Sequence, residues 1–182
     1  RLQVLLPRLL RAVARVPNAE AALSRVLHVI ERIGGRTVYL ALLNENAVAR
    51  ERLFELCAHS QFLSDQIAAF PLLLDELLDD RLFDTTPTRA ELPLELRNRM
   101  ANCAVDDTEE QVEALRKFQR AAMFRIAVPD LTGRLPLMKV SDRLTDIAEL
   151  ICAEAVKLAW GQIAERHGVP QYGPDESHLR DA

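Results

Sequence analysis

The sequence predicts an all-α protein, an antiparallel bundle of about six to eight helices with a long helix pair at its C-terminal end. Apolar residues recur along most of the chain at the three- and four-residue spacing of a helix face. Residues that favour helix caps stand before several of these runs, and glycine or proline follows them. No run alternates polar and apolar residues as a half-buried strand would.

The first clear helix follows Asn18, which is placed to cap it, and ends at Gly34 and Gly35. Its apolar stripe is formed by Leu23, Val26, Leu27, Ile30 and Ile33. Residues 37–44, TVYLALLN, are almost wholly apolar. They predict a short helix that is buried on most sides.

The next two helices are predicted from their caps. Asn46 precedes one of them and Ser60 precedes the other, and Pro71 ends or kinks the second. The stretch LLLDELL adds one or two turns after this proline. Residues 79–89 have turn-forming side chains and no sustained period, so a loop is expected there.

The second half of the chain begins with a helix expected near residues 91–104. Asp107 and Glu110 have the spacing of a capping box, which predicts the start of the longest clear helix. This helix is expected to run to about Val128.

Residues 121–142 predict a joint between two long helices. Pro129 and Gly133 are expected to reverse the chain, so that the two helices pack antiparallel. Ser141 or Asp142 is expected to cap the last long helix, which ends at Gly168.

Two side chains of the helix before this joint lie on unexpected faces. At 100° per residue, Phe124 falls on the charged face and Arg125 falls in the apolar arc. An unpaired buried guanidinium is costly, so Arg125 needs a carboxylate partner. We expect a structural ion pair between Arg125 and Asp130 or Asp142 that fixes how the two long helices cross. A catalytic role for Arg125 is the competing interpretation.

Two large apolar side chains of the last helix, Leu150 and Trp160, lie among charged residues. One interpretation is that another helix of the same chain covers them. The other is that they form a contact with a domain outside this sequence, because exposed apolar patches usually mark contacts.

Composition excludes several classes of protein. The chain has 182 residues, 49% hydrophobic and 27% charged, which is the ordinary mix of a globular domain. A net charge of -4 argues against a nucleic-acid partner, and no run is long and apolar enough to span a membrane. Cys57, Cys103 and Cys152 each stand in an apolar helical pattern, so buried free thiols and a reducing, cytoplasmic compartment are expected.

Motifs that carry catalysis are missing from the sequence. The four histidines are scattered, without a pair at metal-binding spacing. Neither a phosphate-binding GxxxxGK[ST] loop nor a GxGxxG turn occurs. The residues alone therefore predict a helical bundle without a catalytic, cofactor-binding or metal-binding residue.

Several stretches of the sequence together resemble the bacterial glutamine synthetase adenylyltransferases, in order and at matching spacing over nearly the whole chain. They are VYLALLNEN, LCAHSQFLSDQIAAFPLLLDELLDDRLF, ALRKFQRAAMFRIAVPDLTGRLPLMKVSDRLTDIAE and LAWGQIAERHGVP. The resemblance implies a parent enzyme with two related nucleotidyltransferase halves. One half attaches AMP from ATP to a tyrosine of glutamine synthetase, and the other removes it.

The resemblance places this sequence between the two halves, as the central regulatory region and the helical lead-in to the C-terminal adenylylating domain. The family's magnesium-holding signature, a Gly-Ser turn followed by Asp-x-Asp, is absent here. Magnesium and ATP are thus implied for the parent enzyme and not for this segment. The implied partners are the nucleotidyltransferase domain, glutamine synthetase, the signal protein PII and glutamine.

These observations predict a helical regulatory subdomain over residues 1–88, a long-helix subdomain over 89–168, and a flexible tail over 169–182. The predicted function is that of a regulatory, catalytically inactive segment of the adenylyltransferase. The alternative is a self-standing helical interaction module without an enzyme attached, in which Leu150 and Trp160 form the contact patch.

Overall fold

The computed structural model describes residue 7 and residues 18–104 and 106–170. Within these ranges the chain forms seven α-helices and one 3-10 helix and no strand, which confirms the predicted all-α class. Most of the predicted tail lies outside the described residues. The elements are α2 (Ala19–Ile33), α3 (Thr37–Glu45), α4 (Ala47–His59), α5 (Gln61–Ala69), η1 (Pro71–Leu78), α6 (Glu91–Met100), α7 (Thr108–Leu131) and α8 (Leu137–His167).

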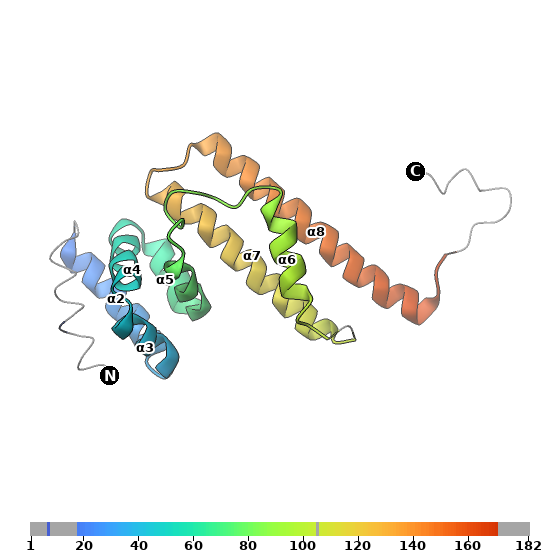
Figure 1. The fold of residues 1–182 in the computed structure, drawn as a ribbon, viewed down its shortest axis with the longest axis horizontal. Helices are drawn as coiled ribbons and strands as arrows, with labels where there is room; N and C mark the ends of the chain where they lie inside the picture. Colours follow the sequence, from blue (N-terminus) through green and yellow to red (C-terminus); the bar gives the residue numbers. More distant parts are fainter. Residues whose placement is uncertain (1–6, 8–17, 105, 171–182) are drawn as a thin grey trace.

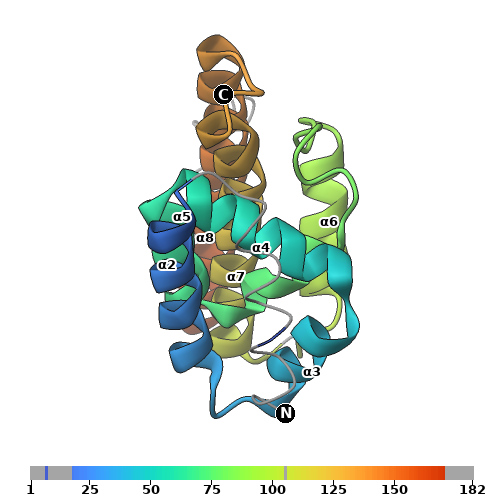
Figure 2. The same cartoon turned by 90° about the vertical axis from the view of Figure 1, so that its left-hand side faces the viewer.

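The helices pack around two hydrophobic clusters. Helices α2 to α5 and η1 gather at one end of the molecule, while α7 and α8 run side by side away from them with α6 alongside (Figure 1). Figure 2 looks onto the α2–α5 end, with α7 and α8 behind it. The first cluster also takes Phe124 and Val128 from α7, whereas the second joins α6 to α8 with Phe118, Ala122 and Ile126 of α7. Helix α7 therefore belongs to both clusters.

Two of the three caps predicted for the first half are formed. The Asn46 side chain accepts a hydrogen bond from the Ala49 amide at 2.9 Å, and Ser60 Oγ accepts one from the Leu63 amide at 3.3 Å. Asn18 does precede α2, but it adopts a left-handed conformation and its side chain makes no cap bond. Gly34 ends α2 as predicted.

Helix α3 is less buried than its composition suggested. Only Leu40 and Leu43 are buried, and Val38 is exposed. The reason is its position, because α3 packs mainly against α2 and α4 at one edge of the first cluster and leaves Val38 73% exposed. The expectation of burial on most sides was wrong.

The start of α7 forms half of the predicted capping box. Asp107 Oδ1 accepts a hydrogen bond from the Glu110 amide at 2.9 Å. The Glu110 carboxylate does not return to Asp107, but accepts from the Ala104 amide at 2.9 Å. Asp107 therefore satisfies one of the free amides of the helix start, and Glu110 ties the preceding turn to it.

We expect Asp107→Ala to lower the free energy of unfolding by about 1 kcal/mol, because an amide of the first turn loses its acceptor. Urea unfolding of the purified chain measures the change. Asp106→Ala is the matched control, since Asp106 is exposed, adjacent and outside the cap. Equal effects of the two substitutions would contradict the cap.

The predicted joint between the long helices is present, with two corrections. Helix α7 continues through Pro129 to Leu131, and Gly133 then turns the chain with φ of 74°, a conformation that glycine adopts without strain. Helix α8 begins at Leu137 with Pro136 at its N-cap position, so Ser141 and Asp142 lie inside the helix and do not cap it. Pro136 has the extended backbone of an N-cap residue, with ψ of 139°, and its carbonyl oxygen accepts a hydrogen bond from the Val140 amide at 3.2 Å, so the helical hydrogen bonds begin there.

Candidate functional site: a charge cluster between the two hydrophobic clusters

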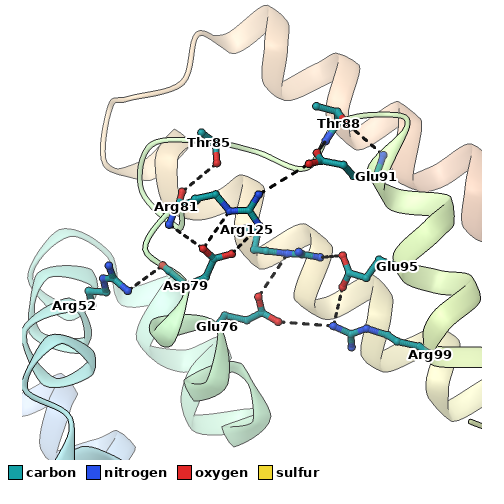
Figure 3. A network of polar contacts seen from close by, with 10 residues as sticks. All are labelled: Arg52, Glu76, Asp79, Arg81, Thr85, Thr88, Glu91, Glu95, Arg99 and Arg125. Carbon is teal, nitrogen blue, oxygen red and sulfur yellow. Dashed lines mark hydrogen bonds and ion pairs between the residues drawn. The ribbon is translucent and has the colours of Figure 1, made fainter.

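Four charged side chains from three elements meet where the two hydrophobic clusters join. They are Glu76 of η1, Glu95 and Arg99 of α6, and Arg125 of α7, and we refer to them as the charge cluster (Figure 3). Arg125 Nη2 lies 2.7 Å from Glu95 Oε2, and Arg99 Nη2 lies 2.8 Å from Glu95 Oε1. Glu76 faces both arginines, with Oε2 3.5 Å from Arg125 Nε and Oε1 3.9 Å from Arg99 Nη2.

Arg125 is thus held by carboxylates, but not by the predicted ones. Five residues along a helix correspond to a rotation of about 140°, so Asp130 points away from Arg125. Asp142 is exposed on α8. The ion pairs of Arg125 connect α7 with η1 and α6, and they do not fix how α7 and α8 cross. The predicted structural ion pair of Arg125 with Asp130 or Asp142 is therefore wrong.

Burial raises the pKa of Glu76, and the neighbouring Glu95 raises it further, while the charges of Arg125 and Arg99 lower it in part. Glu76 Oε2 and Arg125 Nε are within ion-pair distance but do not form a hydrogen bond, and Arg125 Nε has no other acceptor among the described residues. The charge cluster is therefore balanced in charge, with two acids and two arginines, yet incompletely hydrogen-bonded.

A pH-dependent contribution to stability follows from the raised pKa of Glu76. A carboxyl group whose pKa is higher in the folded state favours folding below its unfolded-state pKa, and this contribution is lost as pH rises through the folded-state pKa. We expect the free energy of unfolding of the wild type, relative to Glu76→Gln, to fall as pH rises from about 4 to 7.

Urea unfolding of both chains at several pH values measures this difference, and Glu113→Gln on the surface of α7 provides the control. If the free energy of unfolding of the wild type instead rose relative to that of Glu76→Gln as pH increased, the effect of the arginines on the pKa of Glu76 would outweigh that of burial.

Two further arginines attach neighbouring segments to the first hydrophobic cluster. Arg52 of α4 donates to the carbonyl oxygens of Leu77 and Asp79, at 2.7 and 2.9 Å, and so closes the end of η1 (Figure 3). Arg134, in the joint after α7, lies 2.9 Å from Glu55 of α4, and its guanidinium is 4.8 Å from the Phe83 ring centroid. The joint is therefore held against the first cluster.

The charge cluster forms part of the walls of two cavities. One cavity of about 430 Å³ is lined by Phe70, Glu76, Arg99, Lys117 and Arg120 among others. In this cavity the Arg120 guanidinium lies 4.0 Å from the Phe70 ring centroid. The second cavity, of about 420 Å³, lies on the side of Arg125, Glu95 and the loop of residues 85–88.

The charge cluster does not fit the magnesium and ATP that the resemblance implies for the parent enzyme. Each of its carboxylates lies within ion-pair distance of a guanidinium, so neither is free to hold a cation. In the described part of the chain, no group of three or more histidine, cysteine, aspartate or glutamate side chains is arranged to hold a metal ion.

Leu150 and Trp160, predicted to act together, have different environments. Leu150 is half-buried and packs against the second hydrophobic cluster, so its own chain covers it. Trp160 is 51% exposed. The thiols also differ from the expectation of burial, because only Cys57 is buried, while Cys103 is half-buried and Cys152 is exposed.

The partners of Arg125 carried little signal in the sequence. Glu95 and Arg99 stand four residues apart on a helix, which is the spacing of a surface ion pair. Glu76 is an acid inside the apolar run LLLDELL, an unusual position. Their meeting with Arg125 depends on tertiary packing, because 30 residues separate Arg125 from Glu95.

Fold and site together define an all-α module with a charge cluster at the contact of its two hydrophobic clusters. A family model for glutamate-ammonia ligase adenylyltransferase matches residues 50–179, more than two-thirds of the chain. The chain belongs to this family.

Relatives similar to the chain are named bifunctional glutamine synthetase adenylyltransferase/adenylyl-removing enzyme. The protein of Pseudomonas aeruginosa is 47% identical over 170 residues, 93% of this chain and 17% of the relative. That of Pseudomonas putida is 46% identical over 94% of the chain and 18% of the relative. That of Shewanella oneidensis is 46% identical over 97% of the chain and 18% of the relative. The chain spans less than a fifth of the length of these relatives. No helix in the described ranges is long and apolar enough to cross a membrane.

Proposed function

We propose that this chain is the helical, catalytically inactive connecting region of an enzyme that transfers AMP from ATP to glutamine synthetase and removes it again. Family membership and the names of the relatives support the enzyme class. The observation that carries the connecting role is the position of α7, which packs in both hydrophobic clusters and holds Arg125 at their contact. The subdomains of residues 1–88 and 89–168 and a cytoplasmic location are part of this proposal.

In the proposed role, the chain acts as a rigid connection because ion pairs fix its helices to one another. Arg125 attaches η1 and α6 to α7, Arg99 of α6 pairs with Glu76 of η1, and Arg134 attaches the joint before α8 to α4. A displacement of the first cluster would therefore move α7 and the beginning of α8 with it. In the parent enzyme, this region would hold the catalytic halves in a defined arrangement.

A transfer assay tests the proposal. The chain is incubated with labelled ATP, magnesium and glutamine synthetase, in parallel with the full-length parent. We expect labelled glutamine synthetase from the parent only. Label transferred by the chain alone would overturn the inactive role, and an unlabelled product from the parent would overturn the enzyme class.

Regulation by glutamine and PII, the effectors implied by the resemblance, belongs to the same proposal. The 430 Å³ cavity is large enough for an amino acid, and side chains of both charges line it, among them Asp75, Arg36 and Arg120. Calorimetric titration of the chain with glutamine and with PII measures binding, with Arg120→Met as the cavity variant. Heat from neither ligand would leave the chain only its connecting role.

A further inference from the structure

Helix α8 carries two apolar stripes on different sides. The inner stripe packs with α6 and α7 in the second hydrophobic cluster and consists of Val140, Ile147, Ile151 and Leu158. The outer stripe points away from it by roughly 120° at 100° per residue. We call it the outer face, and it consists of Ala148, Cys152, Ala155, Val156, Ala159, Trp160 and Ile163, all exposed.

The outer face exposes large apolar side chains that a single-chain protein would normally cover. Val156 is 68% exposed and Ile163 is 55% exposed, beside the exposed Trp160. At 31 residues, α8 is longer than the 24-residue α7, and its C-terminal turns extend past the beginning of α7 (Figure 1). No described element packs on this side, so the face is a contiguous apolar surface open to a partner.

The spacing of the outer face indicates what kind of partner fits. Cys152, Val156, Ala159 and Ile163 follow each other at intervals of four, three and four residues, the spacing of a seam between two packed helices. The small side chains of Ala155 and Ala159 let a second backbone approach closely, while Trp160 flanks the seam at its edge. An apolar helix therefore fits this face better than a loop or a sheet edge.

We propose that the outer face of α8 is the docking surface for an apolar helix contributed by the part of the parent enzyme that lies outside this chain. The inference rests on the proposed function. More than four-fifths of each relative lies outside the matched segment, so the parent has ample chain to cover the face. The family model extends over all of α8, so this helix is a feature of the family and not an addition peculiar to this chain.

The alkylation rates of the three cysteines can test this proposal, because the three thiols differ in exposure. Cys152 lies on the outer face, Cys103 is half-buried away from it, and Cys57 is buried, with a pKa raised by burial to about 12. Alkylation by iodoacetamide, followed by mass spectrometry, gives the rate at each thiol. We expect Cys152 to react at least about 10-fold more slowly in the full-length parent than in this chain, because it then reacts only through transient opening. Cys103 should react at the same rate in both.

Two substitutions in the parent sharpen the test. Val156→Glu places a charge in the seam and should restore the rapid reaction of Cys152. Lys157→Glu introduces the same residue one position further on, off the face and exposed, and should leave Cys152 protected. In this chain alone, both variants should keep the wild-type melting temperature, which separates loss of docking from loss of folding.

The other possible results of the alkylation experiment each contradict a different part of the proposal. Equal Cys152 rates in parent and chain would overturn the docking surface, even if the parent adenylylates glutamine synthetase. Protection of Cys152 in this chain alone, with dimers detected by light scattering, would show that a second copy occupies the face and would overturn the proposed occupant. Protection in a parent that transfers no AMP would leave the docking surface standing and contradict only the proposed enzyme class.

Discussion

Phe124→Ala is expected to destabilise the chain by about 3 to 5 kcal/mol, the usual cost of removing a buried phenylalanine side chain. Phe124 is only 3% exposed and packs in the first hydrophobic cluster together with Val128. The helical projection had placed it on the charged face of α7, where the same substitution would cost almost nothing. The free energy of unfolding of Phe124→Ala therefore distinguishes a buried Phe124 from one on the charged face.

Met123→Ala is the matched control, because Met123 is the neighbouring residue on α7 and is 44% exposed. We expect its effect to stay within about 1 kcal/mol. Urea unfolding followed by circular dichroism measures both variants. Equal losses at the two positions would contradict the contact between α7 and the first cluster, and with it the connecting role of α7.

Arg125→Met is expected to lower the free energy of unfolding by about 3 kcal/mol, because removing one partner of a largely buried ion pair leaves the other charge uncompensated. Glu76 and Glu95 would then have only Arg99 as a cationic partner. Because Arg125 lowers the pKa of the buried Glu76 carboxyl, its removal raises that pKa further and makes the charged form of Glu76 more costly. We place the loss at the lower end of the usual range because water reaches Glu95, whose side chain is 27% exposed.

The controls for Arg125 come from the same helix and the same cluster. Arg116→Met makes an identical change at an exposed position of α7 and should alter stability by at most about 0.5 kcal/mol. Combining Arg125→Met with Glu76→Gln removes the buried carboxyl group that lost its arginine partner and should recover part of the loss. An unchanged melting temperature for Arg125→Met, or a double variant that is no better than the single one, would remove the charge cluster as a structural element.

The sequence predicts local structure correctly where the interactions are local. Asn46, Ser60 and Asp107 were predicted as caps and do accept the expected amide hydrogen bonds, because a cap needs only residues within one turn. Helix α8 begins before Ser141 and Asp142, at Leu137, with Pro136 and not a side-chain cap at its N-cap position. Asn18 shows that a favourable residue at a cap position need not use its side chain.

The surroundings of individual side chains follow less directly from the sequence. Arg125 was correctly expected to need carboxylates, because its place in an apolar arc demands them, but the choice of Asp130 and Asp142 followed closeness in sequence. Glu76 and Glu95 reach it only after η1 and α6 have packed against α7. Phe124 was misplaced for the same reason, since the helical projection of α7 assumes one buried side and the folded helix has two.

The sequence by itself determined the all-α class, most helix limits, the reversal between the two long helices and the family, because periodicity, caps, breakers and motif order act over short distances. Only the tertiary structure decided which carboxylates hold Arg125, that α7 is shared between two hydrophobic clusters, and that Cys152 and Trp160 are exposed while Leu150 is covered. The physical reason is that burial and ion pairing depend on which helix faces are brought together, and residues far apart in the chain make that choice jointly.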